Sequence, residues 1–581
     1  MLNLSEMFAN CNINSFEIIH NENSAITGNT QDATNMFANA FNLTECSNMN
    51  TRNLTNVVGM FFMAERLKGV PNFDTKNVTN MSGFFVGCYN LNELPNYDTS
   101  KVTDMSYAFS ELNINSLPNF RTNNVTNMSY AFSGDYGVSG SVPNFNTAKV
   151  TDMSSMLSWC YFLETIPEFD TNNVTNFCEM LAYTAVNDIP NFNFSEAEDT
   201  SNMFRGTPLL AIADLDLYKS SGSTPSANAS YMFSRLASPS TGTQTVNNVS
   251  ITNYLTAKGL FENSNYITSV SDFQVINTHY CNNLFYGCTR LTSIVDTTIG
   301  GGKSTYVNSA FTGCTNLTTL SNVSINGSNT GSNEIFADCA NLTTIDNLNI
   351  NINGINLFRG KSKLTKATNI TCGKNNAAYM FAECNHLTNV DGLRFTYTGT
   401  INFQGLFSGG GQHTTGINGG GFNSKVGGFA GTDISITAPG MNASRNLSAM
   451  FAYCQNLVNA PMLNTNRVTN MAYMFGGCTN LRNIPIYDTN NLANTGFQQF
   501  LTFVWQNSSN LYQKEFYGCN NLTTESVKNV VKMCLNANKI TNTTYKNLNP
   551  ANRYGPFYKT KYDSSYYTDL QSQLTAAGWT F

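Results

Sequence analysis

The chain has 581 residues and a formal net charge of −6 at pH 7, and only 12% of its residues are charged. This balance argues against a protein that binds nucleic acid or anionic lipid through a basic surface. The hydrophobic content of 41% recurs periodically, which argues against a disordered chain. No stretch is apolar over the length that a membrane-spanning helix needs.

One short phrase recurs along almost the whole chain. It begins with an apolar residue followed by Phe or Leu. A Cys often follows three residues after that Phe or Leu, and a Leu follows three residues after the Cys. Examples are FFVGCYNL at Phe84–Leu91 and MFGGCTNL at Met474–Leu481. In the first 205 residues its second position recurs about every 24 residues. A repeat of this length predicts a solenoid, in which each coil buries its apolar side against its neighbours. We therefore predict a leucine-rich-repeat-like solenoid, with a β-strand and a short helical or 3₁₀ turn in each coil.

The first predicted segment, residues 1–205, is the most regular. Its coils repeat a Pro-Asn-Phe-Asp-Thr phrase, as at Pro71–Thr75, and a Val-Thr-Asn phrase, as at Asn77–Met81. Pro supplies no backbone donor, and Asn and Asp favour turn geometry, so the first phrase predicts a turn. Because stacked coils place like residues on like, we expect the Asn and Thr side chains to form ladders along the solenoid.

The remaining segments follow in chain order. Residues 206–407 are predicted to continue the solenoid with a looser period and alternating strands, as at Leu291–Ile299 and Leu342–Ile350. A Gly-rich insertion is predicted for residues 408–440, and the repeats return in residues 441–522. The last segment, residues 523–581, is predicted to be a small, Tyr-rich α-helical cap. Its helices are expected over Thr523–Asn538 and Ser565–Ala577.

Ten of the 15 Cys residues occupy the repeat position, including Cys88 and Cys288. A Cys at one register of a solenoid stacks on its equivalents as a small buried hydrophobe. Disulfide frameworks instead use paired spacings in small domains. We predict structural thiols, which fits synthesis in a reducing compartment.

The sequence contains no constellation typical of catalysis, a metal or a cofactor. The four His residues fall in different coils without metal-ligand spacing, and no nucleophile-elbow or phosphate-loop motif is present. Asp74, Asp98 and Asp170 share one register and suggest a calcium row, but Arg121 and Asn146 interrupt it. A row of turns is the better interpretation. We therefore expect a non-enzymatic protein without cofactors.

The candidate binding surface falls on two segments outside the regular repeats. Loops on a rigid scaffold often carry function, and Tyr offers a rigid amphipathic contact. The first segment is the Gly-rich insertion and the second is the Tyr-rich tail, for which packing on the last coil is the alternative. The candidate residues are Gln412, His413, Phe422, Tyr558, Tyr562, Tyr566 and Tyr567.

The repeated phrases together resemble the BspA-like family of bacterial surface leucine-rich repeat proteins. The resemblance covers about residues 1–522 and is strongest in 1–205 and 440–490. It implies a right-handed solenoid and adhesion to host matrix or to other cells. Similar repeats also occur in tail fibres of bacteriophages of gut bacteria, and the segment from Thr523 onward is similar to the ends of such phage proteins.

The start of the sequence has no basic and apolar segments typical of a secretory signal, and its end does not resemble a wall anchor. On this basis the first hypothesis is a virion protein, a phage tail fibre or appendage that is made in the host cytoplasm. Its expected partners are a glycan or protein receptor on the bacterial surface and other virion proteins that cover the N-terminal end. The sequence is also compatible with a homo-oligomer. Neither binding to nucleic acid nor insertion into a membrane is expected.

The alternative is a bacterial cell-surface adhesin that binds host matrix or other cells. A third hypothesis, a glycan depolymerase, would need two carboxylates flanking a groove. The sequence shows no candidate pair.

Overall fold

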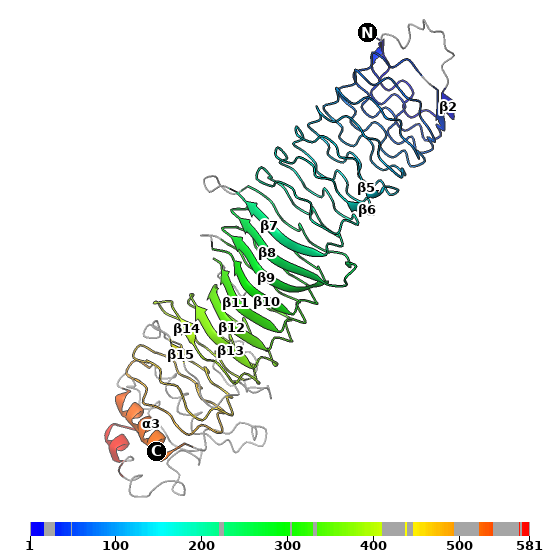
Figure 1. Ribbon diagram of the computed structural model, residues 1–581. Helices are drawn as coiled ribbons and strands as arrows, with labels where there is room; N and C mark the ends of the chain where they lie inside the picture. The colour runs from blue at the N-terminus through cyan, green and yellow to red at the C-terminus, as the bar shows by residue number, and fades with distance from the viewer. Residues whose placement is uncertain are drawn as a thin grey trace. The chain divides into compact units, whose positions relative to one another are not determined.

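The computed structural model describes residues 2–16, 30–47, 49–219, 226–301, 305–328, 334–409, 436–437, 446–492, 522–537, 569 and 572–579. The chain forms two compact units of stacked coils (Figure 1). The first comprises Met1–Ser269 and Phe273–Thr289, and the second comprises Val270–Asp272 and Arg290–Phe581. The predicted leucine-rich-repeat-like solenoid is confirmed, because each coil packs against the next within each unit.

In the first unit, parallel strands from different coils pair as β1 with β3, β2 with β4, β5 with β6 and β7 with β8. β9, Ile267–Ile276, has residues in both units. The other strands are β1 Leu2–Asn3, β2 Ser15–Phe16, β3 Thr30–Asp32, β4 Glu45–Cys46, β5 Ser139–Ser141, β6 Phe162–Thr165, β7 Ala211–Tyr218 and β8 Gln244–Thr252.

In the second unit, strands β10 to β15 pair in parallel in chain order, because each coil contributes one strand to the sheet. The strands predicted over 291–299 and 342–350 are present as β10 and β12. The end of the Gly-rich insertion supplies β15. The bounds are β10 Ser293–Ile299, β11 Thr319–Asn326, β12 Thr344–Asn351, β13 Lys366–Cys372, β14 Leu393–Phe395 and β15 Ile436–Thr437.

An Asn or Asp with positive φ interrupts each long strand at one register. Asp296 has φ 47° and Asn322 has φ 53°, and the pairing of β10 with β11 passes over both residues. Asn347 follows in the next coil with φ 52°. Asn and Asp tolerate this left-handed conformation better than most residues. The amides also bond along the register, since Asn322 Nδ2 donates to Asp296 Oδ1 at 2.8 Å.

The coils of residues 49–205 use successive turns in place of long strands. In the coil that starts at Met105, the N–H groups of Tyr107 and Phe109 donate to carbonyls of the next coil at 2.9 Å. Between them, Ala108 N–H donates to Met105 O at 3.0 Å within the coil. Tyr107 and Glu111 have φ 57° and 58°. The predicted short turn is present, but these left-handed residues prevent it from continuing as a 3₁₀-helix.

Columns of like side chains fill the core. Rings of the repeat Phe stack from coil to coil, as for Phe61 and Phe85, whose centroids lie 5.3 Å apart. The thiol of Cys88 is buried and donates to Phe61 O at 3.2 Å. Burial raises the pKa of Cys88 well above its ordinary value, so the thiol stays neutral and unreactive. The prediction that the repeat Cys is a buried packing residue is confirmed at this position.

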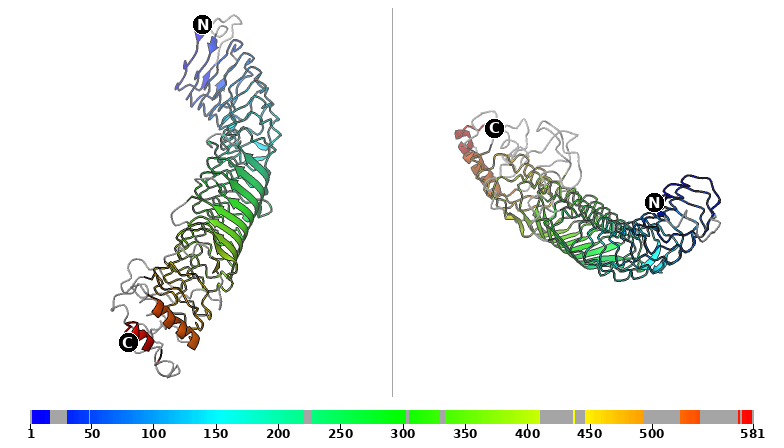
Figure 2. Two further views of the ribbon diagram at one scale, coloured as in Figure 1. Left: turned by 90° about the vertical axis from the view of Figure 1, so that its left-hand side faces the viewer. Right: turned by 90° about the horizontal axis from the view of Figure 1, so that it is seen from above.

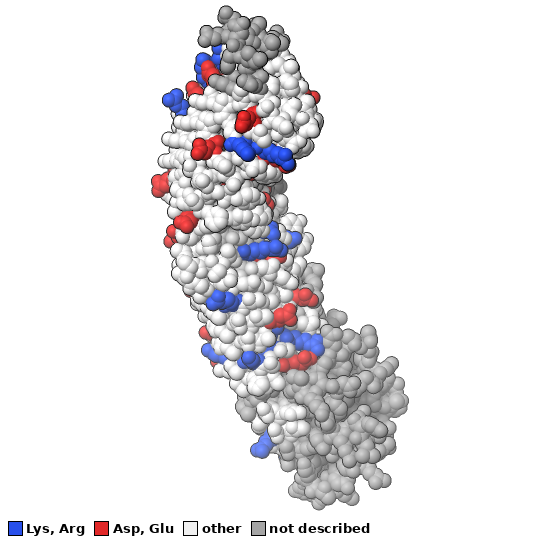
Figure 3. Space-filling model, turned by 90° about the vertical axis from the view of Figure 1, so that its right-hand side faces the viewer, with Lys and Arg blue, Asp and Glu red and all other residues white. Residues whose placement is uncertain are grey.

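The predicted Thr and Asn ladders are also confirmed. The hydroxyl of Thr79 donates to Thr55 O at 3.2 Å in the preceding coil, and Asn77 Nδ2 donates to Arg52 O at 2.8 Å. Thr residues at a second register donate to the following coil and not to the preceding one. For example, Thr99 Oγ1 donates to Arg121 O at 2.8 Å. Neutral side chains therefore satisfy backbone carbonyls along both registers. Most of the described surface drawn in Figure 3 carries neither an acidic nor a basic side chain.

A C-terminal helix packs on the second unit, as predicted (Figure 2). Helix α3, Thr524–Asn536, is capped by Thr523, whose side chain accepts the Ser526 N–H. Ser526 Oγ donates to Arg482 O at 2.8 Å, and Asn529 Nδ2 donates to Ile484 O at 3.0 Å. These bonds fix the helix on the coil that contains Ile484. In the predicted second helix, residues 572–576 are helical.

Candidate functional site

Four aromatic side chains form a connected, solvent-accessible cluster in the first unit. We call Tyr136, Trp159, Tyr161 and Tyr183 the aromatic face. Trp159 stacks on Tyr183 with centroids 4.1 Å apart and meets Tyr161 edge-on at 6.1 Å, with an interplanar angle of 87°. Tyr161 in turn stacks on Tyr136 at 5.8 Å. Trp159 is 40% exposed and Tyr136 is 47% exposed, so the cluster is held by its own contacts while remaining open to a partner.

The repeat itself turns these side chains outward. Leu157 and Cys160 are buried, whereas Trp159 between them has φ 65° and points out of the coil. Its N–H donates to Ala182 O of the next coil at 2.8 Å. Tyr183 occupies the same register with φ 59°. The backbone ladder therefore fixes the spacing of the rings, so little conformational entropy is lost when they bind a partner.

Further aromatic groups lie in the coils before and beside this cluster. Tyr107 stacks on Tyr130 with centroids 4.4 Å apart and an interplanar angle of 5°. Tyr89 donates its hydroxyl to Glu111 Oε2 at 2.8 Å. That bond to a carboxylate raises the pKa of Tyr89 to about 12. The hydroxyl therefore remains protonated at neutral pH and keeps Glu111 engaged.

A glycine in the next coil often makes room for the aromatic ring. A Cβ added to Gly206 would lie 2.6 Å from Tyr183 Cδ1, and one added to Gly259 would lie 2.3 Å from Tyr231 Cε1. Gly477 is placed in the same way beside Tyr453. The rings of these Tyr residues thus pack over glycine backbone, and the glycines help to set where the aromatic groups lie.

We expect Gly206→Ala to destabilise its coil by about 1–2 kcal/mol more than Gly360→Ala does. Both glycines have positive φ, +75° and +71°, so alanine at either costs about 1–2 kcal/mol of backbone strain. At Gly206 the new methyl group also overlaps the Tyr183 ring, whereas nothing lies within 4 Å at Gly360. Local opening free energies from hydrogen exchange measure both costs. Equal losses would show that the packing of Tyr183 over Gly206 is unimportant.

The sequence predicts that each coil buries its apolar side, but the aromatic face was not predicted from it. The signal was present, because Trp159 and Tyr183 each follow a repeat Leu by two residues. All residues of the predicted binding surface lie outside the described part of the chain. They are Gln412, His413, Phe422, Tyr558, Tyr562, Tyr566 and Tyr567.

The row of Asp residues forms turns, as the better interpretation predicted. Asp98 Oδ1 accepts the Ser100 N–H at 3.0 Å, and Asn146 Oδ1 accepts the Ala148 N–H at 3.2 Å in the corresponding turn. Asn thus replaces Asp without loss of the bond. Within the described residues, no three His, Cys, Asp or Glu side chains gather as a metal site would require. Nor does any helix of these residues combine the length and apolar character of a bilayer-spanning segment.

Stacked coils of this kind define a repeat-protein scaffold with a fixed aromatic surface. The family described as "Mycoplasma protein of unknown function, DUF285" matches residues 2–116, 109–216 and 428–548, which together make up more than half of the chain. The chain belongs to this family. The matched segments include the whole aromatic face.

Two solved structures of bacterial proteins are similar to the chain, each at 14% sequence identity. One is a leucine-rich repeat protein from Bacteroides ovatus, with a TM-score of 0.31 over 63% of this chain and 81% of that one. The other is a leucine-rich cell surface protein from Faecalibacterium prausnitzii, with a TM-score of 0.21 over 66% of this chain and 88% of that one. No curated protein matches the chain.

Proposed function

We propose that this protein is a non-enzymatic adhesin of the bacterial cell surface, which binds protein ligands through the aromatic face. The observation that carries the proposal is the connected cluster around Trp159, held at fixed spacing by the coils. Trp and Tyr dominate the binding energy of protein interfaces, where they form well-packed central contacts. A rigid solenoid can present such a cluster without reorganisation.

The ring geometry favours a protein ligand over a sugar at this surface. Trp159 and Tyr183 cover each other's faces at 4.1 Å, and Tyr136 and Tyr161 stack at 5.8 Å. Each stacked pair therefore covers one face of both of its rings, which leaves less open ring face than separate rings would offer. A sugar that stacks on an aromatic residue needs an open ring face. Ring edges and phenol hydroxyls suit the mixed apolar and polar contacts of a protein interface.

The tail-fibre hypothesis assigns the same solenoid to a phage particle and not to the surface of a bacterial cell. The description of the matched family names Mycoplasma, a cellular bacterium, and this supports a cellular protein over a virion component. Labelled antibodies on intact producing cells separate the two: the adhesin is expected at the cell surface. Label confined to released particles would instead support the fibre.

We expect Trp159→Ala to weaken binding to a matrix ligand at least tenfold. Truncation of a central interface Trp typically costs about 2 kcal/mol or more, which corresponds to about a 30-fold change in affinity. The measurement is binding of the purified full chain to immobilised collagen, laminin and fibronectin. A smaller loss of stability is expected as well, since Trp159 is 40% exposed and stacks on Tyr183.

Tyr286→Ala is the matched control, because Tyr286 is 39% exposed and lies outside the aromatic face. It should bind as the unaltered chain does. If both variants bind equally well, the aromatic face is not the contact surface. If the unaltered chain binds none of the three matrix proteins, the proposed ligand class is wrong.

A further inference from the structure

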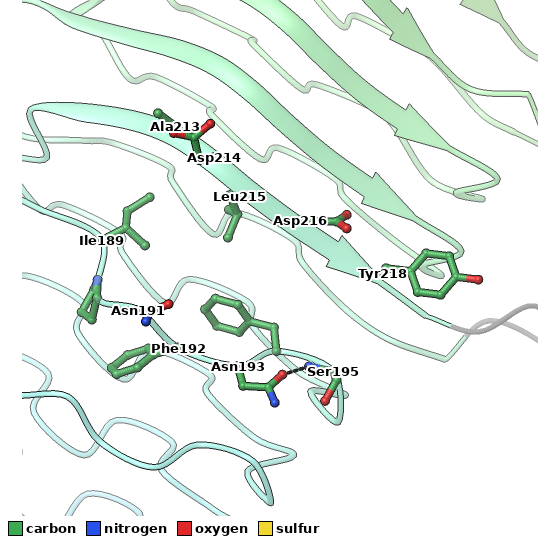
Figure 4. Close-up of a pocket in the computed structure, with 12 residues that line it drawn as sticks. Ile189, Asn191, Phe192, Asn193, Ser195, Ala213, Asp214, Leu215, Asp216 and Tyr218 are labelled. Carbon is green, nitrogen blue, oxygen red and sulfur yellow. Dashed lines mark hydrogen bonds between the residues drawn. The ribbon is translucent and has the colours of Figure 1, made fainter.

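A groove of about 460 Å³ opens in the first unit between residues 189–195 and strand β7 (Figure 4). Its volume is within the range typical of small-molecule sites. Phe192 and Leu215, both largely buried, lie on its two sides. Asn191 and Tyr218 are exposed at its rim, and Tyr218 is 52% exposed. The lining is therefore part apolar and part polar, and it is separate from the aromatic face.

The groove exists because two consecutive coils separate here. Leu210 N–H donates to Asn187 O at 2.8 Å before β7, and Lys219 Nζ donates to Ser195 O at 3.2 Å after it. Between these two points, no hydrogen bond joins residues 189–195 to residues 211–218. β7 pairs with β8 on its other edge only. Backbone N–H and C=O groups of β7 thus face the groove without a strand partner.

Carboxylates add to the polar rim. Asp214 accepts a bond from Asn248 Nδ2 at 2.7 Å, and Asp216 accepts one from the Ser250 hydroxyl. Each side chain is exposed and uses one carboxylate oxygen in this bond, which leaves its other oxygen available to a ligand. Lys219, at the end of the groove, already contacts Glu198 Oε1 at 3.4 Å. None of the residues that line the groove is Lys or Arg.

We propose that this groove binds a saccharide of up to about three units, either neutral or carrying amines. A sugar offers many hydroxyl groups that both donate and accept, which matches the β7 backbone, Asn191 and the two carboxylates. The small parts of Phe192 and Leu215 that reach the groove offer an apolar contact for the C–H groups of the sugar. The carboxylates and the lack of a cationic lining residue disfavour acidic sugars. The bonds from Leu210 N–H to Asn187 O and from Lys219 Nζ to Ser195 O close the two ends of the groove. They favour a compact ligand over a peptide that pairs with β7 as an added strand.

Titration calorimetry on the full chain tests the proposal with four probes: maltotriose, cellotriose, a glucosamine trimer and trigalacturonate. At least one of the first three is expected to bind, and trigalacturonate is not. Asn191→Ala and Tyr218→Ala should each weaken that binding several-fold. For the glucosamine trimer, Asp214→Asn combined with Asp216→Asn should weaken it at least tenfold, because two attractive charges are lost.

Asp296→Asn provides the matched control. Asp296 has φ 47° and accepts Asn322 Nδ2 at 2.8 Å, as Asp214 has φ 52° and accepts Asn248 Nδ2, but it lies on β10 in the other unit. This variant should bind as the unaltered chain does. Absence of binding by all four probes, binding of trigalacturonate alone, or equal binding by all variants would overturn the proposal.

A peptide of alternating Lys and Thr serves as a competitor. If it displaces the saccharide by pairing with β7, strand addition replaces saccharide binding as the function of the groove. These outcomes are independent of the matrix-binding test, since the groove and the aromatic face share no residue.

Discussion

Phe109→Ala is expected to lower the free energy of unfolding of the first unit by about 3–5 kcal/mol. The Phe109 side chain is fully buried, and its ring stacks on Phe120 at 4.8 Å and on Phe132 at 5.9 Å. Truncation removes the transfer free energy of the ring and leaves a cavity that fixed neighbouring coils cannot close. Because each coil contacts only its neighbours, the loss is expected to be greatest in adjacent coils.

Urea unfolding combined with hydrogen exchange measures this effect and locates it. Phe162→Ala is the control, since Phe162 is 62% exposed and its truncation should cost less than about 1 kcal/mol. If Phe109→Ala is no more destabilising than Phe162→Ala, the stacked Phe column does not hold the coils together.

Asp135→Asn is expected to stabilise the first unit at neutral pH and to have little effect near pH 4. Asp135 is fully buried in the register that Cys88 and Cys160 occupy in other coils. Its Oδ1 accepts the Leu112 N–H at 2.9 Å, but its Oδ2 has no hydrogen-bond partner. Burial raises the pKa of Asp135 well above its ordinary value. Asn keeps the acceptor for Leu112 and carries no charge.

The direction of the pH dependence follows from proton binding. The folded state holds the Asp135 proton more tightly than the unfolded state does, so its contribution to stability is complete below the unfolded pKa of about 3.9. Stability is then lost as pH rises toward the folded pKa, by up to about 1.4 kcal/mol per pH unit. Urea unfolding of both proteins from pH 4 to pH 8 measures the difference. A difference that is constant with pH would show that Asp135 is not the titrating group.

The sequence was sufficient to predict the inward-facing columns. Phe85 and Cys88 recur at fixed spacing because every coil must fill the same space against its neighbours. The ladders were predictable for the same reason, as Thr79 and Thr103 both bond to a carbonyl of the preceding coil. The helical cap was visible in the helical spacing of its apolar residues and in Thr523 at its start.

Outward-facing features were not predictable in the same way. The aromatic face needs Trp159 and Tyr183 to have left-handed backbone conformations, which are unusual for bulky residues. The groove depends on the separation of two coils, and no residue pattern marks where hydrogen bonds between coils are missing. Solvent-facing positions are free of the packing constraint that makes the core periodic, so their arrangement appears only in three dimensions.

The most direct test of the proposed adhesin is a hydrogen-exchange footprint of the full chain bound to its matrix ligand. If the aromatic face is the contact surface, bound ligand will slow exchange in peptides that cover residues 130–185, and Trp159→Ala will abolish that protection. Protection confined to other coils, with residues 130–185 unchanged, would contradict the account.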